Sequence, residues 1–241
     1  MPTHFSPEAL KFLRALARHN DRDWFTPRKA LFERELKVPM LALIDEINGA
    51  LLSFAPEHVR VPHKAMFRIH RDTRFSSDKQ PYKTHVAAWW LRTGLEKTSG
   101  AGFYFHFGAK ETVIAAGMYM PSPEQLLAVR RHLLKHHAEL RRLLAGRKLR
   151  AAMDEFDGKR LTRPPRGFPA ASPAMDLLLC RQWGVSATLP AELATQPNLL
   201  KEITKRFAVA SPIVHFLNEP LVGTTRIVLP DGPTARGAVT S

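Results

Sequence analysis

The residues best suited to chemistry gather in one short segment, residues 67–83, which reads FRIHRDTRFSSDKQPYK. Five cations are interleaved there with the carboxylates of Asp72 and Asp78 and the hydroxyl of Ser76, around the rings of Phe75 and Tyr82. A guanidinium group binds a planar or tetrahedral oxyanion through two parallel hydrogen bonds, and a lysine ammonium adds a point charge. The pattern predicts a site for a small phosphorylated or carboxylated ligand, and its candidate residues are Arg68, Arg71, Asp72, Arg74, Ser76, Asp78, Lys79, Tyr82 and Lys83.

Within this segment we expect Arg71 and Arg74 to clamp the anion, while one of the two lysines neutralises charge that develops on it. The two aspartates would orient the arginines. The alternative is structural: Arg71 with Asp72, and Arg74 with Asp78, would form ion pairs that pin a long loop. Five cations facing two carboxylates leave three positive charges without partners, which favours the anion site.

Two further candidates, Tyr104 and His106, alternate with phenylalanines in the sequence GFYFHFG. If the phenylalanines face the core, Tyr104 and His106 face outward, and a neighbouring strand at residues 67–70 would add Arg68 and His70 to the same polar patch. Histidine exchanges protons near neutral pH, so His70 and His106 are the candidates for acid–base catalysis. A sheet histidine satisfied by one hydrogen bond is the alternative, and whether the protein is an enzyme stays open.

The periodicity of apolar residues predicts an α+β fold, with a mainly antiparallel sheet flanked by N-terminal and C-terminal helices. Apolar runs and alternations predict strands at residues 67–70, 85–92, 103–107, 113–120 and 182–188. Helical spacing predicts helices at residues 6–19, 26–36, 39–51, 121–144, 149–156, 174–180, 198–207 and 212–221. We expect a single domain over residues 1–229 and a disordered tail at residues 230–241.

Positive charge is concentrated in two stretches of the chain. The formal net charge is +14, from 36 basic and 22 acidic side chains. Residues 60–92 hold eight basic and two acidic residues, and residues 121–170 hold twelve and five. The alternative function is therefore a nucleic-acid-binding module, in which both stretches form one basic surface and Phe75, Tyr82 and Trp89 stack on bases. The alternation of acids with bases in residues 67–83 favours the small ligand.

The sequence lacks the marks of several other classes of protein. Cys180 is the only cysteine, which excludes an intramolecular disulfide framework and suits a reducing compartment. No apolar run approaches the ~20 residues of a membrane span. The first residues do not resemble a signal peptide, and no glycine-rich phosphate-binding loop occurs. We predict a cytoplasmic protein with no membrane partner, no cofactor and no metal site.

The segment FRIHRDTRFSSDKQPYKTH, together with GFYFH at residues 102–106 and AGMYMP at residues 116–121, carries a family resemblance. It is similar to a family of bacterial and fungal proteins catalogued as domain of unknown function 2461, which shares the motif R-D-x-R-F-S-x-D-K-x-P-Y-K. The resemblance extends from Phe12 to about Leu221. It implies a single compact α+β domain, and it implies no established activity and no catalytic residues.

Overall fold

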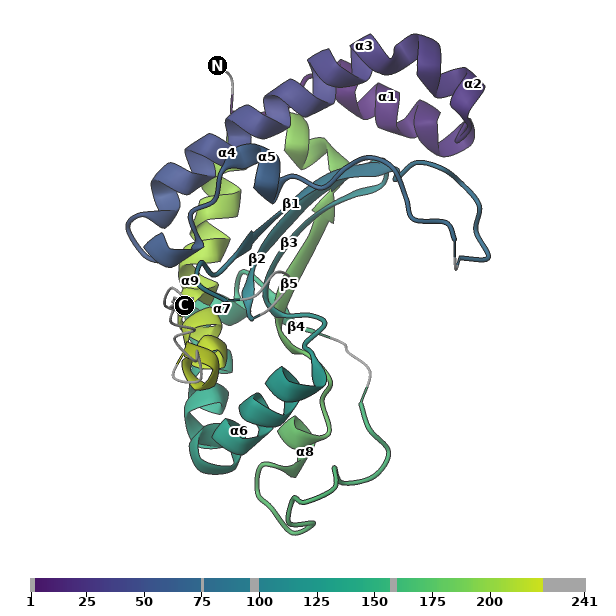
Figure 1. Cartoon of the computed structure of the whole chain (residues 1–241). Coiled ribbons are helices and arrows are strands. Elements are labelled where there is room, and N and C mark those ends of the chain that lie inside the picture. Colours follow the sequence, from purple (N-terminus) through teal and green to yellow (C-terminus); the bar gives the residue numbers. More distant parts are fainter. Residues whose placement is uncertain (1–2, 75, 96–99, 157–159, 223–241) are drawn as a thin grey trace, which may run out of the picture.

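A five-stranded antiparallel sheet lies at the centre of the computed structural model (Figure 1), which describes residues 3–74, 76–95, 100–156 and 160–222. The strand order is β1-β2-β3-β5-β4. The strands are β1 (His85–Leu91), β2 (Gly102–Gly108), β3 (Glu111–Met118), β4 (Asp154–Glu155) and β5 (Trp183–Pro190). The sequence therefore predicted four of the five strands. The tail predicted at residues 230–241 falls outside the described residues.

The N-terminal third of the chain is helical, as its apolar spacing predicts. Ser6 caps the first helix by accepting a hydrogen bond from the Ala9 N–H at 3.1 Å, and a proline occupies the first helical position. The helices are α1 (Pro7–Arg18), α2 (Arg22–Phe25), α3 (Lys29–Phe32), α4 (Val38–Leu51) and α5 (Pro62–Ala65). Single turns η1 (Thr26–Arg28), η2 (Glu33–Lys37) and η3 (Pro56–His58) lie between them.

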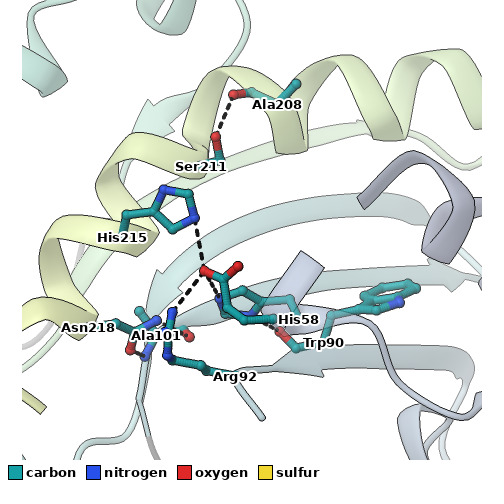
Figure 2. Close-up of polar contacts among 9 residues, drawn as sticks. His58, Trp90, Arg92, Ala101, Ala208, Ser211, His215 and Asn218 are labelled. Atoms are coloured by element: carbon teal, nitrogen blue, oxygen red, sulfur yellow. Dashed lines mark hydrogen bonds and ion pairs between the residues drawn. The ribbon is translucent and has the colours of Figure 1, made fainter. Parts of the chain in front are cut away.

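The C-terminal half contributes α6 (Pro123–Leu144), α7 (Arg147–Arg150), α8 (Met175–Leu178), η4 (Ala191–Thr195) and α9 (Leu199–Val222). The prediction of two helices at residues 198–207 and 212–221 was wrong, because α9 continues through Pro212. A proline has no N–H to donate to the carbonyl four residues before it. The Ser211 hydroxyl donates to that carbonyl, Ala208 O, at 3.0 Å, and so replaces the missing donor (Figure 2).

Helix α9 covers one face of the sheet. The ring of Phe207 lies 4.9 Å from that of Phe103 and 5.5 Å from that of Trp90, and the phenylalanines of β2 are fully buried beside it. In Figure 1 both α4 and α9 lie on this side, and no helix of the described residues covers the opposite side. We call that opposite side the open face; its half-buried and exposed side chains include His85, Trp89, Tyr104, His106, Glu111, Val113, Ser186, Thr188 and Pro190.

The strand predicted at residues 67–70 is absent from the sheet. Only Met66 forms a bridge to β1, and the chain then turns away from the sheet edge. Residues 69–71 instead pair with residues 81–83 through two backbone hydrogen bonds, Arg71 N–H to Pro81 O at 2.9 Å and Lys83 N–H to Ile69 O at 2.8 Å. The apolar alternation of this segment therefore builds the arms of a loop. The prediction of a helix at residues 149–156 was also wrong, because the chain there forms the short α7 and then the strand β4.

Two glycines provide a matched test of the packing between β3 and β5. Gly117 has φ of +141°, and a Cβ there would overlap the carbonyl oxygen of Trp183, whereas a Cβ at Gly49 in α4 would meet nothing within 4 Å. We expect Gly117→Ala to lower the free energy of unfolding by about 2 kcal/mol or more, and Gly49→Ala to raise it by about 0.5–1 kcal/mol. Denaturant unfolding measures both, and a neutral Gly117→Ala variant would contradict this account of the sheet.

Candidate functional site

A loop at residues 66–84 carries most of the predicted site, and its far arm is anchored through Tyr82. The Tyr82 side chain is buried and its ring stacks on that of Phe25 at 4.1 Å. The Asn20 side-chain amide donates to Tyr82 O at 2.9 Å and accepts from the Tyr82 N–H at 3.0 Å. The two hydrogen bonds have the pattern of those between paired strands. Because Asn20 lies between α1 and α2, these helices fix the position of the loop. Tyr82 is thus an anchor for the loop, and its hydroxyl-bearing ring points into the core cluster.

The two arginines expected to clamp an anion are engaged with the loop's own aspartates. Arg71 Nη1 donates to Asp78 Oδ2, and Arg74 donates to both oxygens of Asp72, at 3.0 and 2.7 Å. The hydrogen bonds from Arg74 lower the pKa of Asp72 to about 2. The structural alternative in the sequence paired each arginine with the other aspartate: Arg71 with Asp72, and Arg74 with Asp78. Adjacent side chains such as Arg71 and Asp72 point to opposite sides of an extended backbone, so they do not pair. These pairs brace the tip of the loop.

Two other cations of the loop, Arg68 and Lys83, form no ion pair with a carboxylate anywhere in the described part of the chain. The Lys83 ammonium donates to Arg68 O at 2.9 Å and lies 5.0 Å from the centre of the Phe67 ring. Burial lowers the pKa of Lys83, and the positive charge of Arg68 lowers it further. Lys79 donates to Thr73 O at 3.1 Å and Ser76 is half-buried, both near the loop tip.

Aromatic rings connect these cations to the open face. Phe67 is 37% exposed, and its ring lies 6.3 Å from both the stacked Trp89 ring and the edge-on Tyr104 ring. The chain donates the Phe67 N–H to Ala87 O at the sheet edge, and this places the ring over the open face. A flat apolar platform therefore lies directly beside Arg68 and Lys83.

The open face also carries a compact group around His106. The Tyr104 hydroxyl and His106 Nδ1 are 3.1 Å apart, His85 stacks on His106 at 4.8 Å, and His106 Nε2 lies 3.8 Å from a carboxylate oxygen of Glu111. Burial lowers the pKa of both histidines to about 4, and it raises the pKa of Tyr104 to about 12. All three are neutral at pH 7, so they are suited to hydrogen bonding with a ligand more than to proton transfer near neutrality.

The polar patch predicted from Arg68, His70, Tyr104 and His106 is only partly assembled. Tyr104 and His106 are in contact, and Tyr104 also contacts the ring of Phe67, the residue before Arg68. His70 instead lies against Tyr82 in the loop, with 5.3 Å between ring centres, and no contact within the described chain joins it to His106. The two candidates for acid–base catalysis therefore belong to different environments. His85 was missed because its polar side chain begins a strand whose other residues are apolar.

The register of the sheet separates the 66–84 loop from helix α6, although Arg92 of the first basic stretch and Arg142 of the second line one pocket. The 66–84 loop enters β1 at His85, which pairs with Gly108 at one end of the sheet. Helix α6 follows β3 after Met118, which pairs with Trp183 at the other end. Figure 1 shows the loop and α6 at opposite ends of the molecule. The helix and the loop therefore do not meet in one continuous basic surface.

A second polar cluster, shown in Figure 2, was not predicted from the sequence. Glu57 Oε1 accepts a hydrogen bond from Arg92 at 2.8 Å and lies 3.0 Å from His215 Nε2. His58 lies fully buried beside it, donates from Nδ1 to Trp90 O at 3.0 Å, and has its pKa lowered to about 4 by burial. The members come from three distant parts of the chain, so no local spacing could reveal them. The cluster ties η3, the end of β1 and α9 together.

In its described residues, the protein is an α+β protein whose antiparallel sheet has one face covered by helices and one face open. The chain belongs to the family described as conserved hypothetical protein (DUF2461), whose model matches residues 8–216. No curated protein and no solved structure matches the chain significantly. Across the described residues, no helix is long and apolar enough to cross a membrane, and no group of three His, Cys, Asp or Glu side chains could hold a metal ion.

The anchoring of the loop by Asn20 can be tested directly. Asn20→Ala removes two hydrogen bonds to the Tyr82 backbone, and we expect it to lower the free energy of unfolding by about 1–3 kcal/mol. Amide exchange should accelerate most at residues 69–71 and at Tyr82 and Lys83. Gln80→Ala, on the exposed part of the same loop, is the control. Unchanged exchange in these two arms would contradict the anchoring role.

The buried His58 and the half-buried His85 and His106 make the stability depend on pH. His58, His85 and His106 have a pKa of about 4 in the folded state, below the ordinary 6.5, so the unfolded chain binds protons more readily. Their stability contribution is complete above pH 6.5 and is lost as the pH falls toward 4. We expect His106→Gln to reduce the loss of unfolding free energy between pH 7 and pH 4.5 by about 1–3 kcal/mol.

The exposed residue His63 provides the control for this measurement. Urea unfolding at both pH values should show that His63→Gln retains the full acid destabilisation of the parent protein. An acid destabilisation of the same size in His106→Gln and in the parent would count against burial as the cause.

Proposed function

We propose that the protein binds a small phosphorylated or carboxylated ligand at the edge of the open face, beside the 66–84 loop. The single observation that carries this proposal is the pair Arg68 and Lys83. The Lys83 ammonium bonds to the Arg68 backbone carbonyl, and the Arg68 charge is close enough to lower the pKa of Lys83. Neither cation forms an ion pair among the described residues, although Arg68 is near enough to Asp72 to contribute the smallest of the effects that lower the pKa of that carboxyl. Two like charges this close repel each other, and an oxyanion between them would reduce the repulsion.

The surroundings of this pair suggest the rest of the ligand. The Phe67, Trp89 and Tyr104 rings form an apolar platform next to the cations, which suits a planar or apolar group attached to the phosphate or carboxylate. The neutral His106 and Tyr104 offer hydrogen bonds farther along the open face. The braced Arg71 and Arg74 hold the loop in place, so the oxyanion is assigned to Arg68 and Lys83 and not to them.

The electrostatics of the open face favour binding of the ligand without catalysis. A general base works best when its pKa is near the operating pH, and the pKa of His106 is about 4. The proposal therefore gives His106 a positioning role through its hydrogen bonds. A cytoplasmic location is part of the same proposal, because the half-buried Cys180 is a free thiol and a reducing compartment preserves it.

A nucleic-acid-binding module is the alternative. It would need the loop and α6 to contact one nucleic acid, yet they lie at opposite ends of the sheet. The aromatic platform alone would accommodate one or two stacked bases. The small ligand therefore agrees better with this geometry.

The proposal can be tested by calorimetric titration with phenyl phosphate, benzoate and a single-stranded oligonucleotide. We expect both small anions to bind the parent protein, and the double variant Arg68→Gln, Lys83→Gln to weaken one class of binding site about tenfold or more. Lys110→Gln, an exposed charge in the turn between β2 and β3, is the matched control and should bind as the parent does.

Two results would overturn the small-ligand proposal. One is equal binding by the parent and the double variant. The other is binding of the oligonucleotide alone, with an affinity that falls steeply between about 50 and about 200 mM salt, which would favour the nucleic-acid module.

A further inference from the structure

A separate cavity of about 370 Å³ lies at the other end of the sheet, between α6, α8 and the beginning of β5. Its apolar wall is formed by Leu140, Leu144, Leu177, Phe156 and Trp183. A cavity of this volume is suited to a small organic molecule. The loop with Arg68 and Lys83 does not contribute to its lining.

Behind the wall lies a buried arginine that has no carboxylate partner in the described chain. Arg130 is only 7% exposed, and its guanidinium donates to Leu178 O at 2.8 Å and to Cys180 O at 3.1 Å. These carbonyls lie at and just beyond the C-terminal end of α8. Burial lowers the pKa of Arg130, and the charge of Arg181 lowers it further. The residue thus fixes the chain that lines the cavity and places an uncompensated positive charge next to it.

Of the arginines that line the cavity, one forms an ion pair and two form none among the described residues. Arg141 donates to both oxygens of Asp176, at 2.9 and 2.6 Å, so these two charges cancel. Arg150 and Arg160 also line the cavity, and neither forms an ion pair within the described parts of the chain. The remaining carboxylate of the lining is Glu155, which forms no ion pair there either. With Arg130 behind the wall, the cavity has a clear excess of positive charge.

We propose that this cavity binds a small organic anion, with its phosphate or carboxylate group between Arg150 and Arg160 and its apolar part against the leucines and Trp183. Guanidinium groups without partners are suited to this chemistry, since each offers a fork of N–H donors. The Cys180 thiol forms part of the wall and donates to Asp176 O at 3.3 Å. Burial raises its pKa, so the thiol is protonated and takes no part in binding. This site is independent of the one beside the 66–84 loop.

The position of Cys180 provides a direct readout, because it is the only cysteine of the chain and lines the cavity. Alkylation by N-ethylmaleimide, a neutral reagent, is measured with phenyl phosphate, benzoate or uncharged benzyl alcohol present. We expect the two anions to slow alkylation of the parent protein several-fold or more, and benzyl alcohol to leave it nearly unchanged. The double variant Arg150→Gln, Arg160→Gln should lose this protection.

Two controls separate this proposal from the proposed function. Arg131→Gln, an exposed arginine on α6 outside the cavity lining, should retain the protection, and so should the variant Arg68→Gln, Lys83→Gln. Protection that vanishes in the loop variant would assign the effect to the other site and overturn this inference. Absence of protection by either anion, or equal protection by benzyl alcohol, would also overturn it. Circular dichroism of each variant verifies that the fold is intact.

Discussion

The exchange of two hydrogen bonds between the Asn20 side chain and the Tyr82 backbone is the interaction on which the loop site depends. The loop leaves the sheet edge after Phe67 and returns at β1, so only a contact outside the sheet can fix its far arm. Stacking of Tyr82 on Phe25 adds apolar burial to this anchor. Two further asparagines make the same exchange: Asn48 with Arg60 and Asn218 with Ala101. At these three places an amide side chain takes the place of a neighbouring strand.

The placement of carboxylates decides which cations remain available for a partner. Aspartates hold Arg71, Arg74 and Arg141 in ion pairs, and these pairs stabilise the local chain. Exposed pairs of this kind contribute little to the stability of the whole molecule, so their effect is to position the backbone. Positive charge without such partners then accumulates at two places, beside the 66–84 loop and around the cavity near Arg150. Because the sheet lies between them, one ligand cannot satisfy both places.

Periodicity in the sequence was enough to predict the helices α1, α4 and α6 and four strands, because each of them buries an apolar face. Pairing between distant or exposed groups could not be predicted in this way. The partner of Arg71 is Asp78 and not the adjacent Asp72, since that choice depends on the path of the loop. Continuity of α9 through Pro212 depends on one serine hydroxyl. The cations of the segment at residues 67–83 were recognised as a group, but only the geometry separates those that brace the loop from those that remain unpaired.

The neutral histidines of the open face are coupled to the cations beside them. The low pKa of His85 comes first from burial and then from the positive charges of His106, when protonated, and of Lys83. An anion held by Lys83 and Arg68 would cancel part of that repulsion and make protonation of His85 easier. Since any difference in ligand affinity between two protonation states is reciprocal, a rise in the pKa of His85 on binding means tighter binding at lower pH. The loop cations and the histidines therefore act as one electrostatic unit, although they come from a loop and from two different strands.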